Sequence, residues 1–284
     1  VVVYNARKNG DKYTRQYWDK VAPCIHTRND IMASQNTVHP VDNRVFSIRE
    51  VMLMIKNYKP IQYRHELKHI INPLEAEVLN QRLNLLFNKD HYTLNEGYYD
   101  VHSLYFDTPD DKALKEKLNG VSQRHKFRIR YYNHNLSFIR LEKKLKHNGL
   151  CAKRSTKLTV KQVQDILNGK IDFLLRSDDP LMIEFYSALK GELLKPCVIV
   201  SYQRQAYTYD VSKVRLTIDR HLCTYKNIHD FLSLDNRNIS VDDFAVFEVK
   251  YNEFLPDIVK MVIQGLSQKT SAYSKFAKCR QIDW

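Results

Sequence analysis

The chain has 284 residues and carries 45 Lys and Arg against 32 Asp and Glu, which gives a formal net charge of +13. At 43% hydrophobic and 27% charged residues, the composition is typical of a globular protein and excludes a disordered or fibrous one. The basic balance favours polyanionic partners, which are nucleic acid, an acidic membrane surface or phosphate-rich small molecules. Five scattered cysteines without a CxxC pair argue against a disulfide framework or a zinc site and indicate a reducing cytoplasm. No apolar run approaches the roughly 18–20 residues that a membrane helix needs.

Residues 1–58 differ from the rest of the chain because they are rich in Asn, Thr, His and Arg. Near their end, Ser47 and Glu50 have the spacing of a capping box, which predicts the start of a helix. The stretch APCIHTRNDIMASQNTVHPVDNRVFSIREVM resembles the C-terminal part of DNA cytosine-C5 methyltransferases, where an Asn-Arg precedes such a helix. The cofactor-binding strand and catalytic Pro-Cys loop of that family are missing, and so short a fragment cannot bury its own core. We therefore interpret this segment as a relic of a fusion, which can be disordered, and not as a working methylase.

From residue 59 onward the sequence is regular, and we treat residues 59–284 as one domain. IQYRHELKHII alternates like a strand, and Asn72-Pro73 then open the helix PLEAEVLNQRLNLLF. YYDVHSLYFDT is β-branched and aromatic, which predicts a strand, and DDKALKEKL is a short amphipathic helix. FRIRYY and SFIRLEKKL are predicted strands, joined by the turn residues Asn133-His134-Asn135.

The second half of the domain continues this mixture of strands and helices. Thr159 caps the predicted helix VKQVQDILNG, and Gly169 is its stop signal. The remaining predicted helices are PLMIEFYSALKGELL and PDIVKMVIQGL, and the remaining predicted strands are CVIVSYQRQAYTYD, VRLTIDRHL and AVFEVKY. Antiparallel-type strands with interspersed helices predict an α+β domain built on a large sheet.

The predicted strands separate apolar and ionic residues onto opposite faces, because side chains alternate with period two. Arg128 and Arg130 share one face, while Phe127 and Ile129 share the other. The ionic faces of all the strands carry Arg64, Glu66, Lys68, Arg128, Arg130, Arg140, Glu142, Lys144, Arg204, Arg215, Asp219, Glu248 and Lys250.

An antiparallel sheet with one face in water is the simplest interpretation of this pattern. However, Arg, Lys and Glu dominate the polar faces, and like charges on adjacent strands repel one another. A closed barrel with an apolar exterior under helices and an ionic lumen satisfies both faces. Its expected contents are phosphates with a divalent cation.

Residues from about 60 to 284 resemble the polyphosphate polymerase domain of the vacuolar transporter chaperone (VTC) family. That family is a branch of the CYTH, or triphosphate tunnel metalloenzyme, superfamily. The segments that carry the resemblance, in the family's order, are YRHELKHII, DVHSLYFDTPD, KFRIRYY, IRLEKKLKHNGLCAKRS, VSYQRQAY, VRLTIDR, FEVKY and SAYSKFAKC. The first strand has Glu-x-Lys, as in the VTC branch, and lacks the Glu-x-Glu-x-Lys of other tunnel enzymes. The resemblance implies an antiparallel β-barrel tunnel with helices packed on the outside.

The resemblance also implies the roles of individual residues. The side chains that would act on the transferred phosphoryl group are Arg128, Arg130, Lys144, Arg204 and Arg215. Those that would bind substrate phosphates are Lys68, Lys153, Lys250, Ser274 and Lys275. The metal ligand would be Glu248, together with Glu66 and Glu142, and carboxylate oxygens suit Mg²⁺ or Mn²⁺.

The implied reaction transfers the γ-phosphoryl group of ATP to a growing polyphosphate chain inside the tunnel. Three alternatives stay open: a triphosphatase with the same fold, a non-catalytic polyphosphate-binding module, and a nucleic-acid-binding protein, which the pattern disfavours. A membrane-bound partner is compatible with the family but is not visible in the sequence.

Other candidate sites in the sequence are weak. No P-loop or Rossmann glycine motif is present, and the chain has only seven glycines. The histidines lack paired metal-ligand spacing, so we interpret them as surface or packing residues; they include His65, His69, His102, His125 and His147. Asp107 in YFDTPD is expected to start a turn.

Overall fold

The computed structural model describes residues 61–93, 97–234, 238–267 and 270–282, together with the backbone of four short strands between residues 2 and 32. The chain divides into two compact units, residues 1–60 and residues 61–284. In the first unit two antiparallel pairs form, and these are β1 (Val2–Tyr4) with β2 (Tyr13–Arg15) and β3 (His26–Arg28) with β4 (Ile31–Met32). The predicted capping box at Ser47 and Glu50 lies outside the described residues, and the methyltransferase-like interpretation stays a prediction.

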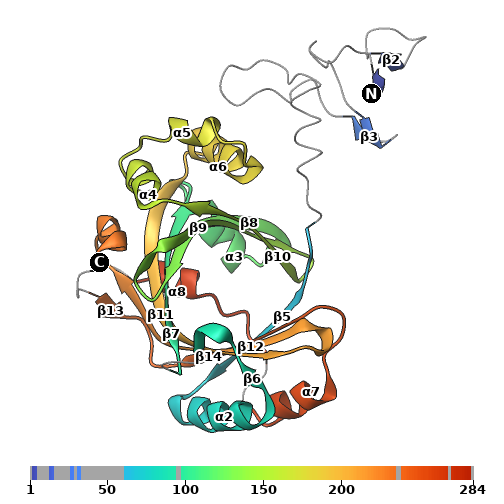
Figure 1. The fold of residues 1–284 in the computed structure, drawn as a ribbon, viewed down its shortest axis with the longest axis vertical. Coiled ribbons are helices and arrows are strands. Elements are labelled where there is room, and N and C mark those ends of the chain that lie inside the picture. The colour runs from blue at the N-terminus through green and yellow to red at the C-terminus, as the bar shows by residue number, and fades with distance from the viewer. Residues whose placement is uncertain are drawn as a thin grey trace. The chain divides into compact units, whose positions relative to one another are not determined.

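One large antiparallel sheet forms the second unit (Figure 1). Its eight main strands are β5 (His65–Ile71), β7 (Tyr99–Asp107), β8 (Gln123–Tyr132), β9 (Asn135–His147), β10 (Leu150–Leu158), β11 (Lys195–Tyr209), β12 (Val214–Tyr225) and β14 (Ala245–Tyr251). Their order in the sheet is β10-β9-β8-β7-β11-β12-β14-β5, with β6 (Asn88–Lys89) beside β11 and β13 (Asn238–Ser240) beside β12. The predicted antiparallel α+β class is confirmed.

The sheet curls until its two edge strands meet. Arg64, next to β5, and Cys151, in β10, form an antiparallel bridge with both backbone hydrogen bonds at 2.9 Å. This single bridge is not a continuous ladder, so the sheet is curled toward a barrel without full closure, and it has an inner and an outer face. We call the inner face the lumen.

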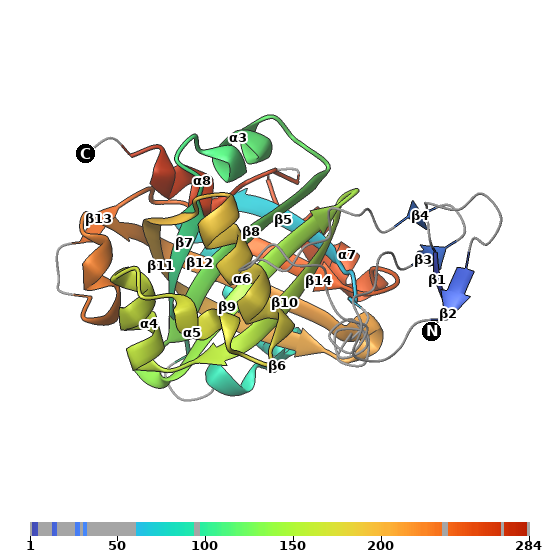
Figure 2. The ribbon, with the colours of Figure 1, turned by 90° about the horizontal axis from the view of Figure 1, so that it is seen from above.

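Helices cover the outer face on two sides, as Figures 1 and 2 show. On one side are α4 (Val160–Leu167), α5 (Asp172–Leu175) and α6 (Pro180–Gly191), and on the other are α2 (Pro73–Leu86) and α7 (Asp257–Gln264). The shorter helical elements are α3 (Lys112–Leu118), α8 (Lys275–Arg280), η1 (His91–Thr93), η2 (Val211–Lys213) and η3 (Ile228–Leu232). No described helix is long and apolar enough to cross a membrane.

Local sequence signals set the ends of several helices. Asn72 accepts the backbone N–H of Glu75 at 2.8 Å, and the Glu75 carboxylate accepts the N–H of Asn72, which completes a capping box at the start of α2. Thr159 caps α4 in the same way, and Gly169 follows that helix at φ = +76°. Asp107 accepts the N–H groups of Thr108 and Ala113 at 2.9 and 2.8 Å, so its role as a turn residue is confirmed.

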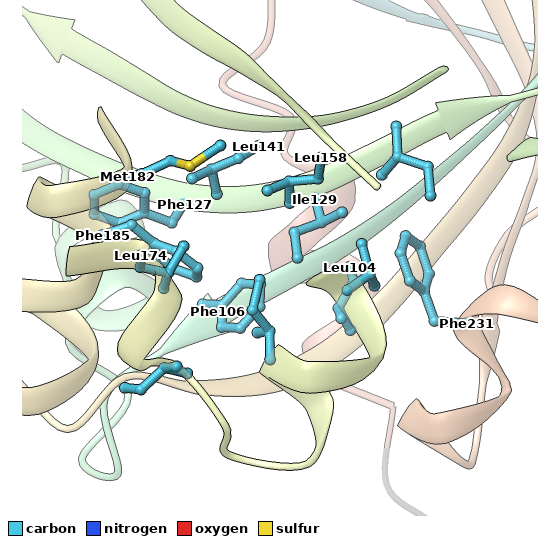
Figure 3. Packing of buried hydrophobic residues seen from close by; sticks show 14 of the residues in the cluster. Leu104, Phe106, Phe127, Ile129, Leu141, Leu158, Leu174, Met182, Phe185 and Phe231 are labelled. Atoms are coloured by element: carbon cyan, nitrogen blue, oxygen red, sulfur yellow. The ribbon is translucent and has the colours of Figure 1, made fainter. Parts of the chain in front are cut away.

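The outer face of the sheet is apolar and forms the core with the helices. Phe127, Ile129 and Leu141 of β8 and β9 pack against Phe185 of α6 and Leu174 of α5 (Figure 3). A second cluster joins Phe247 and Val249 of β14 to α2 and α7. Burying side chains of this size stabilises the fold by roughly 1.5–3 kcal/mol each.

Helix α8, unlike the helices on the outer face, packs against the inner face of the sheet. Its residues Phe276 and Cys279 cluster with Val101 and Val200, which face the lumen. The preceding segment from Ser271 to Ser274 lines the same cavity as the lumen strands. The C-terminal part of the domain therefore contributes to the lumen instead of to the outer shell.

Candidate functional site

The lumen contains a cavity of ≈ 160 Å³ that is built from the ionic faces of the strands. The register explains this gathering, because Lys68 pairs with Glu248, and Arg128 pairs with both Tyr105 and Glu142 on neighbouring strands. Ten of the thirteen predicted site residues line the cavity: Glu66, Lys68, Arg128, Arg130, Lys144, Arg204, Glu248, Lys250, Ser274 and Lys275. Charged side chains from separate strands thus converge on one space, as the alternation predicts.

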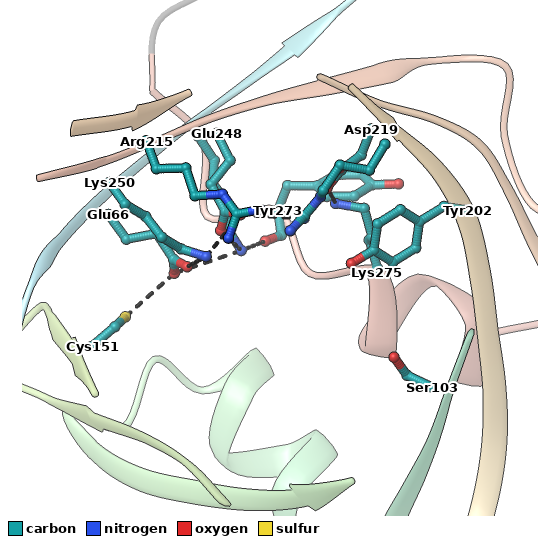
Figure 4. A network of polar contacts seen from close by, with 12 residues as sticks. Glu66, Ser103, Cys151, Tyr202, Arg215, Asp219, Glu248, Lys250, Tyr273 and Lys275 are labelled. Carbon is teal, nitrogen blue, oxygen red and sulfur yellow. Dashed lines mark hydrogen bonds and ion pairs between the residues drawn. The ribbon is translucent and has the colours of Figure 1, made fainter. Parts of the chain in front are cut away.

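Two carboxylates, the partly buried Glu66 of β5 and the buried Glu248 of β14, form the acidic part of the cavity (Figure 4). Lys144 donates to Glu66 at 2.8 Å, and the Lys250 ammonium lies 3.2 Å from Glu248. Burial alone would raise the pKa of Glu248, but the charges of Lys250 and Lys68 outweigh burial and hold it well below its ordinary value. Both carboxylates are therefore ionised, and their oxygens are hard ligands of the kind that Mg²⁺ and Mn²⁺ prefer.

A second acidic residue, Glu142, organises the arginines of β8. Its carboxylate lies 2.6 Å from Arg128 and 2.6 Å from Lys153, and 4.0 Å from Arg130. These cations hold the pKa of the buried Glu142 far below its ordinary range against the opposing effect of burial. Arg130 also donates to Ser103 at 2.8 Å. Glu142 thus fixes the direction of the guanidinium groups, and the structure does not bring it to the Glu66–Glu248 pair.

Asp219 of β12 is a site residue that the sequence reasoning missed. Arg204 donates to its two oxygens at 2.6 and 2.7 Å, and the Lys275 ammonium lies 2.7 Å away. Asp219 is 2% exposed, and this bidentate geometry fixes the plane of the Arg204 guanidinium. The signal was available, because Asp219 shares the inner face of its strand with Arg215.

The predicted residues Arg215 and Lys153 are not part of the cavity lining, although Arg215 is in register with Lys250 and lies beside it in Figure 4. Arg215 lies 2.6 Å from the Asp90 carboxylate and donates to the Tyr99 hydroxyl at 2.9 Å. Lys153, which is about half exposed, pairs with Glu142. Neither is among the residues that line the described cavity, so a ligand could contact them only if it extended beyond this cavity.

The cavity holds more cations than the sequence reasoning selected. Among the described residues, eleven Lys and Arg side chains line it against two carboxylates, and the additional ones are Lys117, Arg124, Lys126 and Lys146. Arg124 and Lys126 share the alternation of Arg128 and Arg130, so the run RHKFRIR contained this signal. Burial lowers the pKa of Lys126 to about 7. For Tyr105, burial alone would raise the pKa, but Arg128 and Arg130 outweigh it and lower the pKa to about 7.

The fold and the cavity together define a barrel-like antiparallel sheet whose lumen has a strongly basic lining. The family model of the VTC domain matches residues 63–282, and the chain belongs to this family. No curated protein matches the chain.

Three solved structures are similar to the chain at low identity. A protein named as a candidate adenylate cyclase from Bacillus halodurans has a TM-score of 0.44 and 14% identity, over 72% of this chain and 88% of that one. A Pyrococcus horikoshii protein has a TM-score of 0.41 and 13% identity, over 76% and 97% of the two chains. The Mimivirus capping enzyme triphosphatase has a TM-score of 0.35 and 11% identity, over 75% and 94%. At these scores the likenesses carry no argument about activity.

Proposed function

We propose that this protein is a metal-dependent polyphosphate polymerase, which transfers the γ-phosphoryl group of ATP to a polyphosphate chain in the lumen. Membership of the VTC domain family supports a triphosphate-related function. The observation that carries the proposal is the lining of one cavity by eleven cationic side chains and two carboxylates, counted over the described residues. A chain of phosphates supplies the many negative charges that such a lining can neutralise.

Carboxylates of the protein orient the lumen cations. Glu142 directs Arg128, and Asp219 directs Arg204 and Lys275, in each case through contacts of 2.6 to 2.7 Å. Positive charge that is already in position stabilises the transferring phosphoryl group without the cost of reorganising the site. We assign Arg128, Arg130, Lys144 and Arg204 to this task, and Lys68, Lys250, Ser274 and Lys275 to holding the flanking phosphates.

The reaction requires no nucleophile from the protein, because the attacking atom is an oxygen of the acceptor phosphate. The bond from this oxygen to the γ-phosphorus forms as the bond from the γ-phosphorus to the β,γ-bridging oxygen of ATP breaks, and ADP leaves. Catalysis then consists of alignment and charge neutralisation, which fixed guanidinium and ammonium groups supply.

A metal fits the carboxylate pair of the lumen. Glu248 is buried and Glu66 is partly buried. Both have lowered pKa values and can each offer an oxygen ligand, and phosphate oxygens or waters would complete the shell. When bound there, Mg²⁺ or Mn²⁺ supplies further neutralisation of phosphate oxygens. Glu142 is less suited to this role, because Arg128 and Lys153 occupy its oxygens at 2.6 Å.

The product formed from ATP tests the proposal. The protein is incubated with ATP and Mn²⁺, and the products are resolved by size on a gel and by phosphate release. We expect long-chain polyphosphate and ADP from the unaltered protein and from Arg176→Ala, a control that removes an exposed arginine of the outer surface. Arg130→Ala should form polymer at least about 100-fold more slowly. Release of inorganic phosphate without polymer would show that the protein is a triphosphatase instead. Tight tripolyphosphate binding without turnover would show that it is a binding module.

A further inference from the structure

A second group of potential ligands lies on the outer face of the barrel. Asp100 and His102 of β7 alternate with Val101, which faces the lumen cluster, so both point away from the cavity. The turn between β8 and β9 brings His134 beside them. One ligand atom from each of the three residues lies within 4.8 Å of the other two.

His102 is held as a metal-binding imidazole would be. It is 5% exposed, and its Nδ1 lies 2.9 Å from the Ser201 hydroxyl. Its Nε2 is buried and has no hydrogen-bond partner within the described part of the chain. When Nδ1 donates to Ser201, Nε2 carries the lone pair that a metal requires.

The turn that carries His134 is fixed against β7. The Asn133 N–H donates to the Asp100 carbonyl at 3.1 Å, and the Asp100 N–H donates to the Asn133 side chain at 2.7 Å. Asn133 and His134 both have positive φ, which is the geometry of a tight two-residue hairpin turn. The imidazoles of His102 and His134 are consequently neighbours, with ring centroids 4.8 Å apart.

The separations are close to those of a metal centre. Two ligands at about 2.0–2.1 Å from a tetrahedral Zn²⁺ are about 3.4 Å apart. Atoms that lie within 4.8 Å of one another need to approach by as much as about 1.4 Å, and a rotation of the exposed side chain of His134 can supply this movement.

We propose that Asp100, His102 and His134 bind a transition-metal ion of the Zn²⁺ class on the outer face of the barrel, separate from the lumen. Two imidazoles and one carboxylate suit Zn²⁺, whereas Mg²⁺ prefers an all-oxygen shell. The ion ties the β8–β9 turn to β7, whose partner strand β8 carries Arg128 and Arg130 on its other face. The pattern was hidden in the sequence because His134 reaches the site only through the hairpin.

Zn²⁺ titration of the tag-free protein tests this site. Calorimetry is performed with excess Mg²⁺, which occupies the carboxylates of the lumen. We expect one Zn²⁺ per chain for the unaltered protein and for His229→Ala, which removes an exposed histidine elsewhere. His134→Ala and Asp100→Asn should each weaken binding by at least about 100-fold, because each removes or neutralises a ligand. Equal binding by these variants, or no binding by the unaltered protein, would overturn the proposal.

Two further readouts do not depend on enzymatic activity. Co²⁺ bound to the unaltered protein should give the visible absorption of a four- or five-coordinate ion, and this absorption should be lost in His134→Ala. Zn²⁺ should raise the Tm of the unaltered protein and of His229→Ala, but not that of His134→Ala. Absorption typical of octahedral Co²⁺, or an equal rise in Tm for all three proteins, would contradict the site. All of these outcomes are independent of whether polyphosphate is formed.

Discussion

The two faces of strand β8 differ completely within four consecutive residues. Phe127 and Ile129 are at most 1% exposed and pack under the helices, whereas Arg128 and Arg130 point into the lumen and contact Glu142 and Ser103. The outer face supplies the apolar burial that stabilises the barrel. The inner face supplies charge that contributes little to such burial and is arranged for a ligand.

The inner face also shows how a basic lumen is tolerated. Each of the four carboxylates named above contacts at least two cations; these residues are Glu66, Glu142, Asp219 and Glu248. These contacts offset the repulsion between neighbouring Lys and Arg side chains. The lumen carboxylates thus separate and orient the cations. They do not neutralise all of the positive charge of the lumen, which remains basic.

The largest expected effect comes from removing a lumen cation. Arg130→Ala should lower polymer formation by about 10²–10³-fold, because it removes one preorganised donor to the transferring group. Its Tm should stay close to that of the unaltered protein, since the side chain is not part of the apolar core. Initial rates and thermal denaturation measure the two quantities. An unfolded Arg130→Ala protein would show that the faces of β8 have been assigned wrongly.

Glu248→Gln distinguishes the contribution of the lumen carboxylates to activity from that of the lumen cations. We expect turnover to fall by about 100-fold and to lose its dependence on Mn²⁺, because a metal ligand is neutralised. Tripolyphosphate binding in EDTA should be unchanged or tighter, since a negative charge beside Lys250 and Arg204 is removed. Calorimetry and rate measurements over a range of Mn²⁺ concentrations test this division. Unchanged turnover would exclude Glu248 as the ligand.

A substitution on the outer face should lower stability and leave the rate of polymer formation unchanged. Ile129→Ala should lower the free energy of unfolding by about 2–5 kcal/mol, because it opens a cavity in the core beneath the helices. The folded fraction should retain its rate of polymer formation. Urea denaturation gives the first value, and the rate per folded molecule gives the second. A loss of rate without a loss of stability would break the division between the two faces.

The smallest expected effect is the uptake of a proton when a phosphate chain binds. Burial lowers the pKa of Lys126 to about 7, so the side chain is largely neutral at pH 8. A bound phosphate chain favours the charged form of Lys126 and raises that pKa. At pH 8, Lys126 should therefore take up as much as about one proton from the buffer when the phosphate chain binds. Affinity for tripolyphosphate should therefore fall as the pH rises above 7.

Calorimetry at pH 8 in buffers of different ionisation enthalpy counts these protons. Lys126→Met should take up fewer protons than the unaltered protein. Tyr105→Phe serves as a second comparison, because the Tyr105 hydroxyl also has a pKa near 7 and would regain a proton. An equal count for Lys126→Met and the unaltered protein would exclude Lys126 as a phosphate-linked group.

The alternation of residues in the sequence was sufficient to predict much of the lumen. The period-two pattern placed Arg128, Arg130 and Lys144 on one face, and the observed register brings them to a single cavity. Capping signals such as Asn72 and Thr159 located helix starts, because they act through backbone groups only a few residues away.

Contacts between distant segments could not be predicted in the same way. The pairing of Lys275 with Asp219 depends on α8 entering the lumen, and no local signal in a six-residue helix specifies that position. The ion pair of Arg215 depends on Asp90, which lies between β6 and η1. The group around His102 likewise requires the turn of a neighbouring hairpin.

A structure of the protein with bound tripolyphosphate and Mn²⁺ tests the central claim most directly. The account predicts that the phosphates lie in the lumen, with oxygens within hydrogen-bond distance of Arg128, Arg130 and Arg204. Tripolyphosphate on the outer surface, with the lumen cations still paired only to their carboxylates, would contradict it.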